Sequence, residues 1–174
     1  MYHKVGDIMK KNIMIFGGSL FINEAFNQMK YKVLNNKLII KLKGKFEIDN
    51  FSSIKLTTSK SIKFMKEFIK VRQYSDCVIA LGEADIELNN KDEFKSNLIT
   101  MVNILKEHNI NPLMVSLPKN YRNDIIAMEY QEIIDSVVNS ENLQYVYYGD
   151  TDLDVSYKVT TKSQMKRAII DFCK

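Results

Sequence analysis

The feature that most constrains the fold is the segment Phe16-Gly17-Gly18-Ser19-Leu20, which follows the apolar run Ile13-Met14-Ile15. An apolar run that ends in two glycines and a serine, and then opens an amphipathic stretch, predicts a strand, a tight turn and a helix. Such a turn exposes the serine hydroxyl at a helix N-terminus, where backbone N–H groups and the helix dipole stabilise developing negative charge. Esterases present a nucleophilic serine in this way. The pattern therefore favours an α/β fold with Ser19 at the carboxyl end of its first strand.

Strand and helix patterns alternate along the rest of the chain. The run from Cys77 to Leu81 is apolar throughout, which predicts a central parallel strand buried on both faces. Alternation of this kind, with short links, implies a parallel sheet covered by helices on both faces. The predicted strands are 13–16, 38–42, 77–81, 112–117 and 143–148, with 46–48 either extending the second strand or forming a hairpin with it; the predicted helices are 20–29, 62–69, 94–105, 126–137 and 165–172.

Length and composition restrict the possible classes of protein. At 174 residues we expect one domain over 1–174, with residues 1–8 as a loose leader. The net charge of +4 comes mostly from lysines spread along the chain, with only three arginines, so we expect no nucleic-acid partner. No apolar run approaches the roughly 20 residues of a membrane span, and the Gly17-Gly18-Ser19 break argues against a secretion signal. We therefore expect a cytoplasmic protein with no membrane span.

Residues that bind metals or form disulfides are few. Cys77 and Cys173 lie far apart in the chain, and we interpret them as two reduced thiols. The only histidines are His3 and His108, which leaves no metal-ligand spacing. We therefore expect no metal and no cofactor.

Two blocks of the chain resemble the SGNH (GDSL-type) hydrolase family. The segment from Ile13 to Leu20 is similar to the block whose Gly-Asp-Ser carries the nucleophile, with Gly18 in place of the Asp. The segment Gly82-Glu83-Ala84-Asp85 is similar to the block Gly-x-Asn-Asp, with Ala84 in place of the Asn. The resemblance implies a flavodoxin-like three-layer α/β sandwich with a five-stranded parallel sheet in the order 2-1-3-4-5. It also implies acyl-ester hydrolysis.

The resemblance assigns the remaining site residues by position. Residues 150–158 fall where the family has its Asp-x-x-His block, so Asp154 matches the catalytic Asp and Tyr157 stands at the histidine position. The oxyanion-hole glycine of the second block has its nearest match in Lys55. The implied set is Ser19 and Asp154 as catalytic residues, with Gly18, Lys55, Gly82, Ala84, Asp85 and Tyr157 around the oxyanion and the substrate.

The missing histidine leaves Ser19 without an evident base. His108 ends a predicted helix at the amino edge of the sheet, and a strand of five or six residues, roughly 17–20 Å long, separates that edge from Ser19. His3 precedes the first strand and lies at the same wrong edge. A Ser–Lys pair with Lys158 or Lys162 would need a buried lysine of lowered pKa.

Three functions follow from these residues. The first is an acyl-ester hydrolase of weak or lost activity, with Ser19 as nucleophile and a small-molecule ester as substrate. The second is a non-catalytic binding domain for a sugar, an acyl group or a protein partner, and the third is a phosphate or nucleotide binder at the Gly17–Ser19 turn. Structural roles also remain open: Ser19 or Asp85 can cap a helix or turn, and the loop carrying Asp150, Asp152 and Asp154 can be simply solvated.

Overall fold

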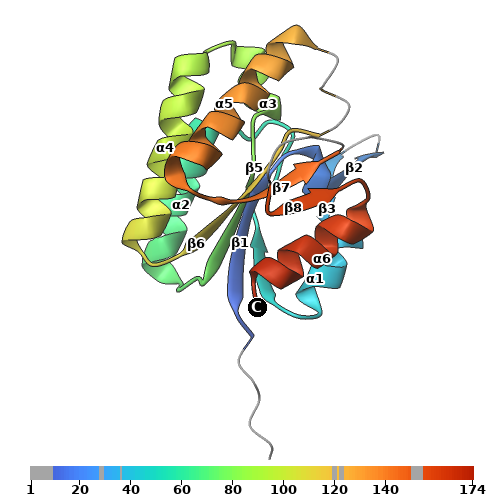
Figure 1. The fold of residues 1–174 in the computed structure, drawn as a ribbon. Coiled ribbons are helices and arrows are strands. Elements are labelled where there is room, and N and C mark those ends of the chain that lie inside the picture. The colour runs from blue at the N-terminus through green and yellow to red at the C-terminus, as the bar shows by residue number, and fades with distance from the viewer. Residues whose placement is uncertain (1–9, 28–29, 36, 119–120, 122–123, 150–154) are drawn as a thin grey trace, which may run out of the picture.

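The sheet is a parallel, twisted layer in the middle of the molecule (Figure 1). In the computed structural model the described residues are 10–27, 30–35, 37–118, 121, 124–149 and 155–174. The strand order is β4-β1-β5-β6-β7-β8. This confirms the predicted parallel sheet and its 2-1-3-4-5 order, with β8 added at the far edge. The strands are β1 (Asn12–Gly17), β4 (Glu47–Asn50), β5 (Asp76–Ala80), β6 (Asn111–Val115), β7 (Gln144–Tyr148) and β8 (Tyr157–Val159).

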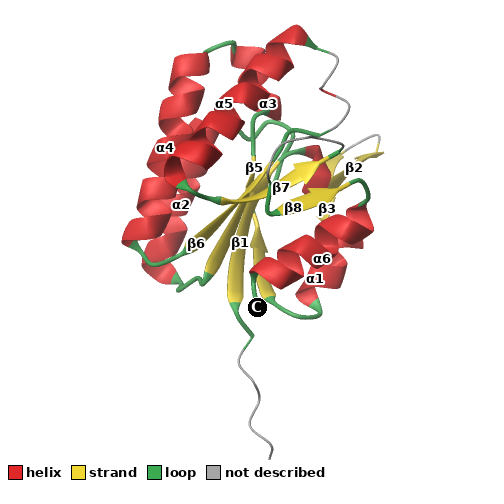
Figure 2. Ribbon diagram, viewed as in Figure 1, coloured by secondary structure: helices red, strands yellow, loops and turns green. Residues whose placement is uncertain are grey.

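Helices cover both faces of this sheet (Figure 2). One face packs against α2 (Thr58–Val71), α4 (Lys91–Glu107) and α5 (Ile125–Glu141), and the other packs against α1 (Lys37–Lys43) and α6 (Lys162–Phe172). A short helix, α3 (Glu83–Leu88), follows β5 at the carboxyl edge. Two hydrophobic cores result, one on each face of the sheet. Because side chains of a strand alternate between faces, each buried strand contributes side chains to both cores.

Strand β5 is the central strand that the apolar run predicts. All five of its residues are buried, and it pairs in parallel with β1 on one side and β6 on the other. Cys77 and Ile79 pack into the core under α2, α4 and α5, whereas Val78 and Ala80 pack under α1 and α6. The register places Gly17 opposite Ala80, so the turn after β1 and the turn after β5 lie side by side.

The predicted strand at 38–42 is wrong, because this segment is helix α1. Leu38, Ile39 and Leu42 are buried, whereas Ile40 is 61% exposed. Burial at positions i, i+1 and i+4 is the spacing of one helix face, and the adjacent isoleucines disguise it as a strand. The second strand of the sheet is instead β4, which pairs in parallel with β1 and forms no hairpin with the preceding segment.

The predicted helix at 20–29 is also wrong. A 3-10 turn, η1 (Ser19–Phe21), is followed by β2 (Ile22–Asn27), which pairs antiparallel with β3 (Lys30–Asn35). The apolar residues between 20 and 29 satisfy helical spacing, but the segment is short and such runs also fit strands. As a consequence no long helix begins at Ser19, and the helix dipole expected there is missing.

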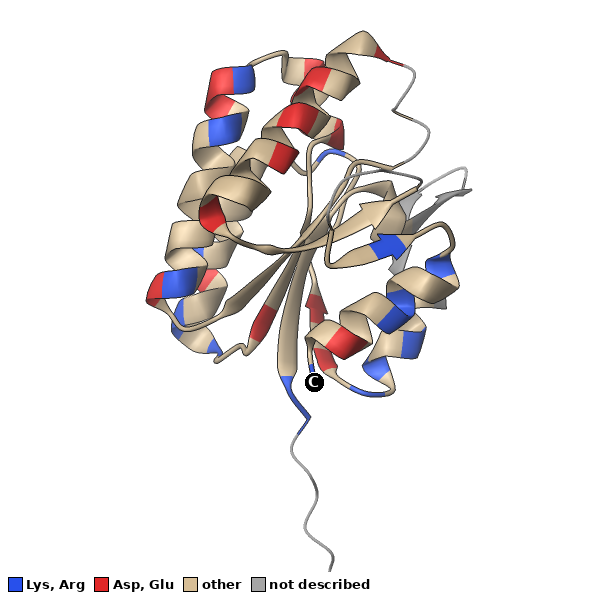
Figure 3. Cartoon of the chain, in the orientation of Figure 1, with Lys and Arg blue, Asp and Glu red and all other residues tan. Residues whose placement is uncertain are grey.

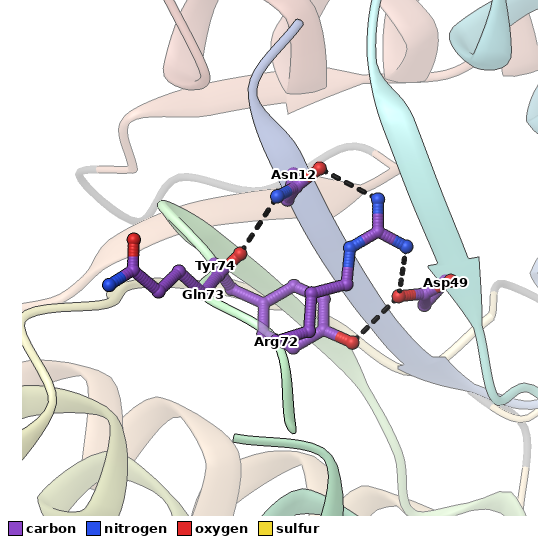
Figure 4. Close-up of polar contacts among 5 residues, drawn as sticks. All are labelled: Asn12, Asp49, Arg72, Gln73 and Tyr74. Atoms are coloured by element: carbon purple, nitrogen blue, oxygen red, sulfur yellow. Dashed lines mark hydrogen bonds and ion pairs between the residues drawn. The ribbon is translucent and has the colours of Figure 1, made fainter. Parts of the chain in front are cut away.

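A polar cluster ties β1 and β4 to the end of α2 at the amino edge of the sheet (Figure 4). Arg72 forms an ion pair with Asp49 at 2.8 Å and donates to Asn12 Oδ1 at 2.7 Å. The Tyr74 hydroxyl donates to the same Asp49 carboxylate at 2.6 Å. Burial, and then this hydrogen bond, raise the pKa of Tyr74. The cluster stabilises the edge opposite to the one where Ser19 lies.

Charged residues lie on both helical layers (Figure 3). Helix α5 carries acidic residues and no lysine or arginine, whereas α1 and α6 carry several basic residues and one acidic residue, Asp171. Among the helices of the described chain, none has the length and apolar character to cross a membrane. No group of three or more His, Cys, Asp or Glu among the described residues is placed to hold a metal ion.

Candidate active site

Ser19 lies exposed at the carboxyl end of β1, as the Gly-Gly-Ser pattern predicts. Gly17 ends the strand and Gly18 precedes the 3-10 turn, with its N–H donating to Ala80 O at 3.3 Å. No side chain caps this turn, so the interpretation of Ser19 as the N-cap of a first helix is wrong. Its hydroxyl is left available for another partner.

The partner of Ser19 is Glu83, the first residue of α3. The Ser19 N–H donates to Glu83 Oε1 at 3.0 Å, and the Ser19 hydroxyl lies close enough to this carboxylate to lower its pKa. Tyr121 donates to Glu83 Oε2 at 3.4 Å. A Cβ on Gly18 would overlap the Glu83 carboxylate, so a larger residue here would displace that carboxylate. Two turns, one after β1 and one after β5, thus bring a hydroxyl and a carboxylate together.

Burial dominates the electrostatics of Glu83. The residue is 7% exposed, and desolvation raises the pKa of its carboxyl above the ordinary value. Hydrogen bonds from the side chain and backbone of Ser19, and from Tyr121, lower the pKa in part. Tyr121 in turn has a raised pKa, first because of burial and then because of the Glu83 charge. The carboxyl of Glu83 therefore releases its proton at a higher pH than an exposed glutamate does.

Asp85 has a structural role in the fold. Its carboxylate accepts hydrogen bonds from the Thr58 N–H at 3.0 and 3.1 Å and from the Thr58 hydroxyl at 2.6 Å. It therefore caps the N-terminus of α2 from a distant part of the chain. Desolvation raises the pKa of Asp85, and its bonds to Thr58 lower it in part. This acceptor role matches the capping alternative, although the helix capped is α2 rather than the turn that follows Asp85.

The other residues of the Gly82–Asp85 turn shape the site without supplying a donor side chain. Gly82 has φ +129°, a conformation that strongly favours glycine, and a Cβ there would lie 2.8 Å from Leu117 Cδ2. Ala84 is buried and presents only a methyl group where the resemblance implies an amide donor. Lys55 is exposed in the loop after β4, and its N–H donates to Ser53 Oγ at 3.3 Å.

The structure does not bring Tyr157 to Ser19. Tyr157 begins β8, which is separated from β1 by three strands, so about 19 Å of sheet lies between them at about 4.8 Å per strand. It lines a different cavity, near the amino ends of β6 and β7, together with Asn111 and Gln144. Lys158 is on the same edge strand, and Lys162 opens α6 after it.

Of the expected catalytic acid and the two histidines, the structure describes His108 alone. Asp154, with Asp150 and Asp152, is outside the described residues, as is His3. His108 ends α4, where its Nδ1 lies 2.9 Å from Ile104 O, and the amino end of β6 follows at once. Among the described residues no histidine is therefore placed to serve as a base for Ser19.

An apolar cavity of about 270 Å³ opens beside Tyr121. Leu117, Ala127, Met128 and Tyr147 supply much of its wall, and Gln131 and Glu132 supply polar groups. Leu117 also contacts the Gly82 turn, so the cavity adjoins the Ser19–Glu83 pair through both Leu117 and Tyr121. Its size suits a small acyl or alkyl group.

Sequence reasoning missed Glu83 and Tyr121. Glu83 is the variable residue of the Gly-x-Asn-Asp block, so the resemblance gives it no role. The available signal was an acidic residue placed directly after a glycine that ends a buried strand. Tyr121 lies in the loop before α5, and no spacing in the sequence connects it to residue 83.

Comparison with protein-family models and with curated proteins finds no match. Solved structures of esterases are similar in fold. Axe2, an acetylxylan esterase from Geobacillus stearothermophilus, is 13% identical with a TM-score of 0.66 over 95% of this chain and 94% of its own. The esterase EstA from Pseudoalteromonas sp. is 15% identical, with a TM-score of 0.65 over 93% and 98%.

A third similar structure bears on the resemblance itself. AlinE4, described as an SGNH-hydrolase family esterase, is 17% identical with a TM-score of 0.63 over 82% of this chain and 77% of its own. At these identities the likeness is one of fold. The chain therefore has the α/β fold of the SGNH hydrolases.

Proposed function

We propose that this chain is a slow acyl-ester hydrolase of the SGNH type, with Ser19 as its nucleophile. The observation that carries the proposal is the exposed Ser19 at the carboxyl end of β1, whose N–H donates to the buried carboxylate of Glu83 at 3.0 Å. Ligands of open parallel sheets bind beyond the carboxyl ends of the strands, which is where this pair lies. The shared fold with Axe2 and EstA supports the same reaction class.

The cavity beside Tyr121 is the proposed site for the acyl group. Its wall is mostly apolar, and a volume of about 270 Å³ is small for a ligand pocket. An ester whose carbonyl carbon lies at Ser19 would extend its acyl group past Tyr121 into this cavity. The substrate class is therefore an ester of a short acyl group with a small alcohol or a carbohydrate.

Turnover is slow because the oxyanion would meet few donors. Ala84 has no amide side chain, and the Lys55 N–H already donates to Ser53. Each absent oxyanion donor typically reduces kcat about 10²–10³-fold. The Ser19 N–H is the donor that remains, and in the resting protein it points to Glu83.

That last contact also favours a second function. A non-catalytic binding domain has no oxyanion to stabilise, so it could tolerate the Glu83 carboxylate on the Ser19 N–H. In that case the same cleft would hold an acyl or carbohydrate ligand without cleaving it.

Turnover of p-nitrophenyl acetate by three purified proteins separates the two functions. The wild type should hydrolyse the ester slowly and Ser19→Ala should fall to background. The control Ser163→Ala, a change at an exposed serine of α6, should match the wild type. Equal rates in all three proteins would contradict hydrolysis at Ser19 and favour the binding domain.

A further inference from the structure

We propose that Glu83 is the general base of Ser19 and so replaces the absent histidine, an inference that rests on the proposed ester hydrolysis. The two residues are already in contact, since the Ser19 N–H donates to Glu83 Oε1 at 3.0 Å, and the neighbouring Ser19 hydroxyl is close enough to the same carboxylate to lower its pKa. A base must lie within hydrogen-bond reach of the proton it removes. Among the described residues, Glu83 is the ionisable side chain that meets this requirement.

The surroundings of Glu83 suit this role. Burial to 7% exposure makes its carboxylate more basic than one in water, because desolvation disfavours the charged form. The titratable side chain that faces it from another element is Tyr121, at 3.4 Å from Oε2. Ser19 and Tyr121 are the groups whose hydrogen bonds hold the carboxylate in place. Lys119 and Arg122, which flank Tyr121 in the sequence, lie outside the described residues.

The acylation step balances with these groups alone. Glu83 accepts the Ser19 Oγ proton while Oγ bonds to the ester carbonyl carbon, giving a tetrahedral oxyanion and a neutral Glu83 carboxylic acid. The carbon–oxygen bond to the alcohol then breaks, and the departing oxygen takes the proton from Glu83. Water repeats the sequence on the acyl-serine, with Glu83 as base, and releases the acid and free Ser19.

The same proton transfer changes the oxyanion environment. While ionised, Glu83 opposes negative charge near the Ser19 N–H, which it also occupies at 3.0 Å. Once it carries the proton of Ser19 it is neutral, and the N–H becomes available to the oxyanion. Glu83 is therefore both the base and the group that holds the oxyanion donor, the Ser19 N–H. Its protonation removes the repulsion as negative charge develops on the oxyanion.

A direct test follows the labelling of Ser19 by a fluorophosphonate probe between pH 4 and 9, together with p-nitrophenyl acetate turnover. Glu83→Gln retains an oxygen that can accept from the Ser19 N–H but cannot take a proton. We expect both rates to fall about 10²–10⁴-fold, the usual contribution of a positioned base. The matched control is Glu87→Gln, a charge change on an exposed residue of the same helix, which should leave both rates unchanged.

A second variant gives a readout that misfolding does not mimic. Tyr121→Phe removes a hydrogen bond that lowers the pKa of Glu83, so the acid limb of the wild-type pH profile should move to higher pH. Far-UV circular dichroism and thermal unfolding establish that each variant is folded.

The outcomes separate the two proposals. Labelling that depends on Glu83, without ester turnover, supports the base and contradicts the proposed function. Turnover that depends on Ser19 but is unchanged in Glu83→Gln supports the function and overturns the base. Faster labelling in Glu83→Gln overturns the base, because the carboxylate would then act only as an obstruction, and absence of labelling at every pH overturns it as well.

Discussion

Replacing Asp85 by alanine should destabilise the protein through the N-terminus of α2. Thr58, the first residue of this helix, is fully buried, and its N–H and hydroxyl both donate to the Asp85 carboxylate. The Thr58 N–H is one of the helix donors that have no partner within the helix. Thr57 caps a different donor, the N–H of Lys60, and cannot replace Asp85.

The size of the destabilisation follows from the two Thr58 donors that lose their acceptor in Asp85→Ala. An orphaned buried N–H costs about 1–3 kcal/mol, whereas the Thr58 hydroxyl can rotate toward another acceptor. Removing the carboxylate also relieves the desolvation that raises the pKa of Asp85, which offsets part of this cost. We therefore expect the free energy of unfolding at pH 7 to fall by about 2 kcal/mol in Asp85→Ala, and by about 1 kcal/mol in Asp85→Asn, which keeps an acceptor oxygen.

Urea unfolding followed by far-UV circular dichroism measures this difference, since the chain has no tryptophan for fluorescence. The control is Glu87→Ala, an exposed acidic residue of α3, whose change should stay within about 0.5 kcal/mol of the wild type. An Asp85→Ala protein as stable as that control would refute the capping role. A functional role for Asp85 at Ser19 would then regain support.

Three further predictions concern the site and the cores. Gly18→Ala places a Cβ on the Glu83 carboxylate, which must move to make room, so it should slow probe labelling of Ser19; unchanged labelling would contradict the close approach of Glu83 to Gly18. Because burial raises the folded-state pKa of Glu83, wild-type stability should decrease as pH rises from about 4.3 through that pKa. The decrease should be smaller in Glu83→Gln, where the raised pKa of Asp85 still contributes, when unfolding is measured across the range. Cys77 and Cys173 are fully buried thiols of raised pKa, so a thiol reagent should modify them slowly in the native protein and rapidly in urea, whereas fast native reaction would show that the cores open.

Buried strands were predictable from the sequence because burial on both faces leaves a continuous apolar run. Cys77–Leu81 contains most of strand β5 and predicts its parallel pairing with β1. The turns at Gly17 and Gly82 were predictable for a related reason, since each glycine lies directly after an apolar run. These signals depend on local chemistry and need no information from distant residues.

Short amphipathic segments were not predictable in the same way. In α1, two adjacent isoleucines suggest a strand, and only the burial of Leu38 and Leu42 with exposure of Ile40 reveals the helix. The segment after Ser19 fits helical spacing yet forms the β2–β3 hairpin. In both cases tertiary contacts decide between a helix and a strand, because the apolar spacing of so short a run fits both.

The candidate site was only partly predictable, because its key contact joins two loops. Ser19 and the Gly82–Asp85 turn were expected at one edge of the sheet, and the parallel register of β1 and β5 brings them together. The role of Glu83 depends on a side-chain approach that no motif encodes. It became visible only through the space beside Gly18 and the burial of the carboxylate.

One carboxylate that serves as base and also occupies the oxyanion donor restricts how fast this site can work. Below the pKa of Glu83 the Ser19 N–H is free of a negative neighbour, but no base removes the hydroxyl proton. Above that pKa the base is present, and its charge faces the position where the oxyanion forms. The two requirements are met together only after Ser19 has passed its proton to Glu83 within a turnover. A site with a separate base and separate oxyanion donors does not have this conflict, so the arrangement of Ser19 and Glu83 itself predicts slow hydrolysis at every pH.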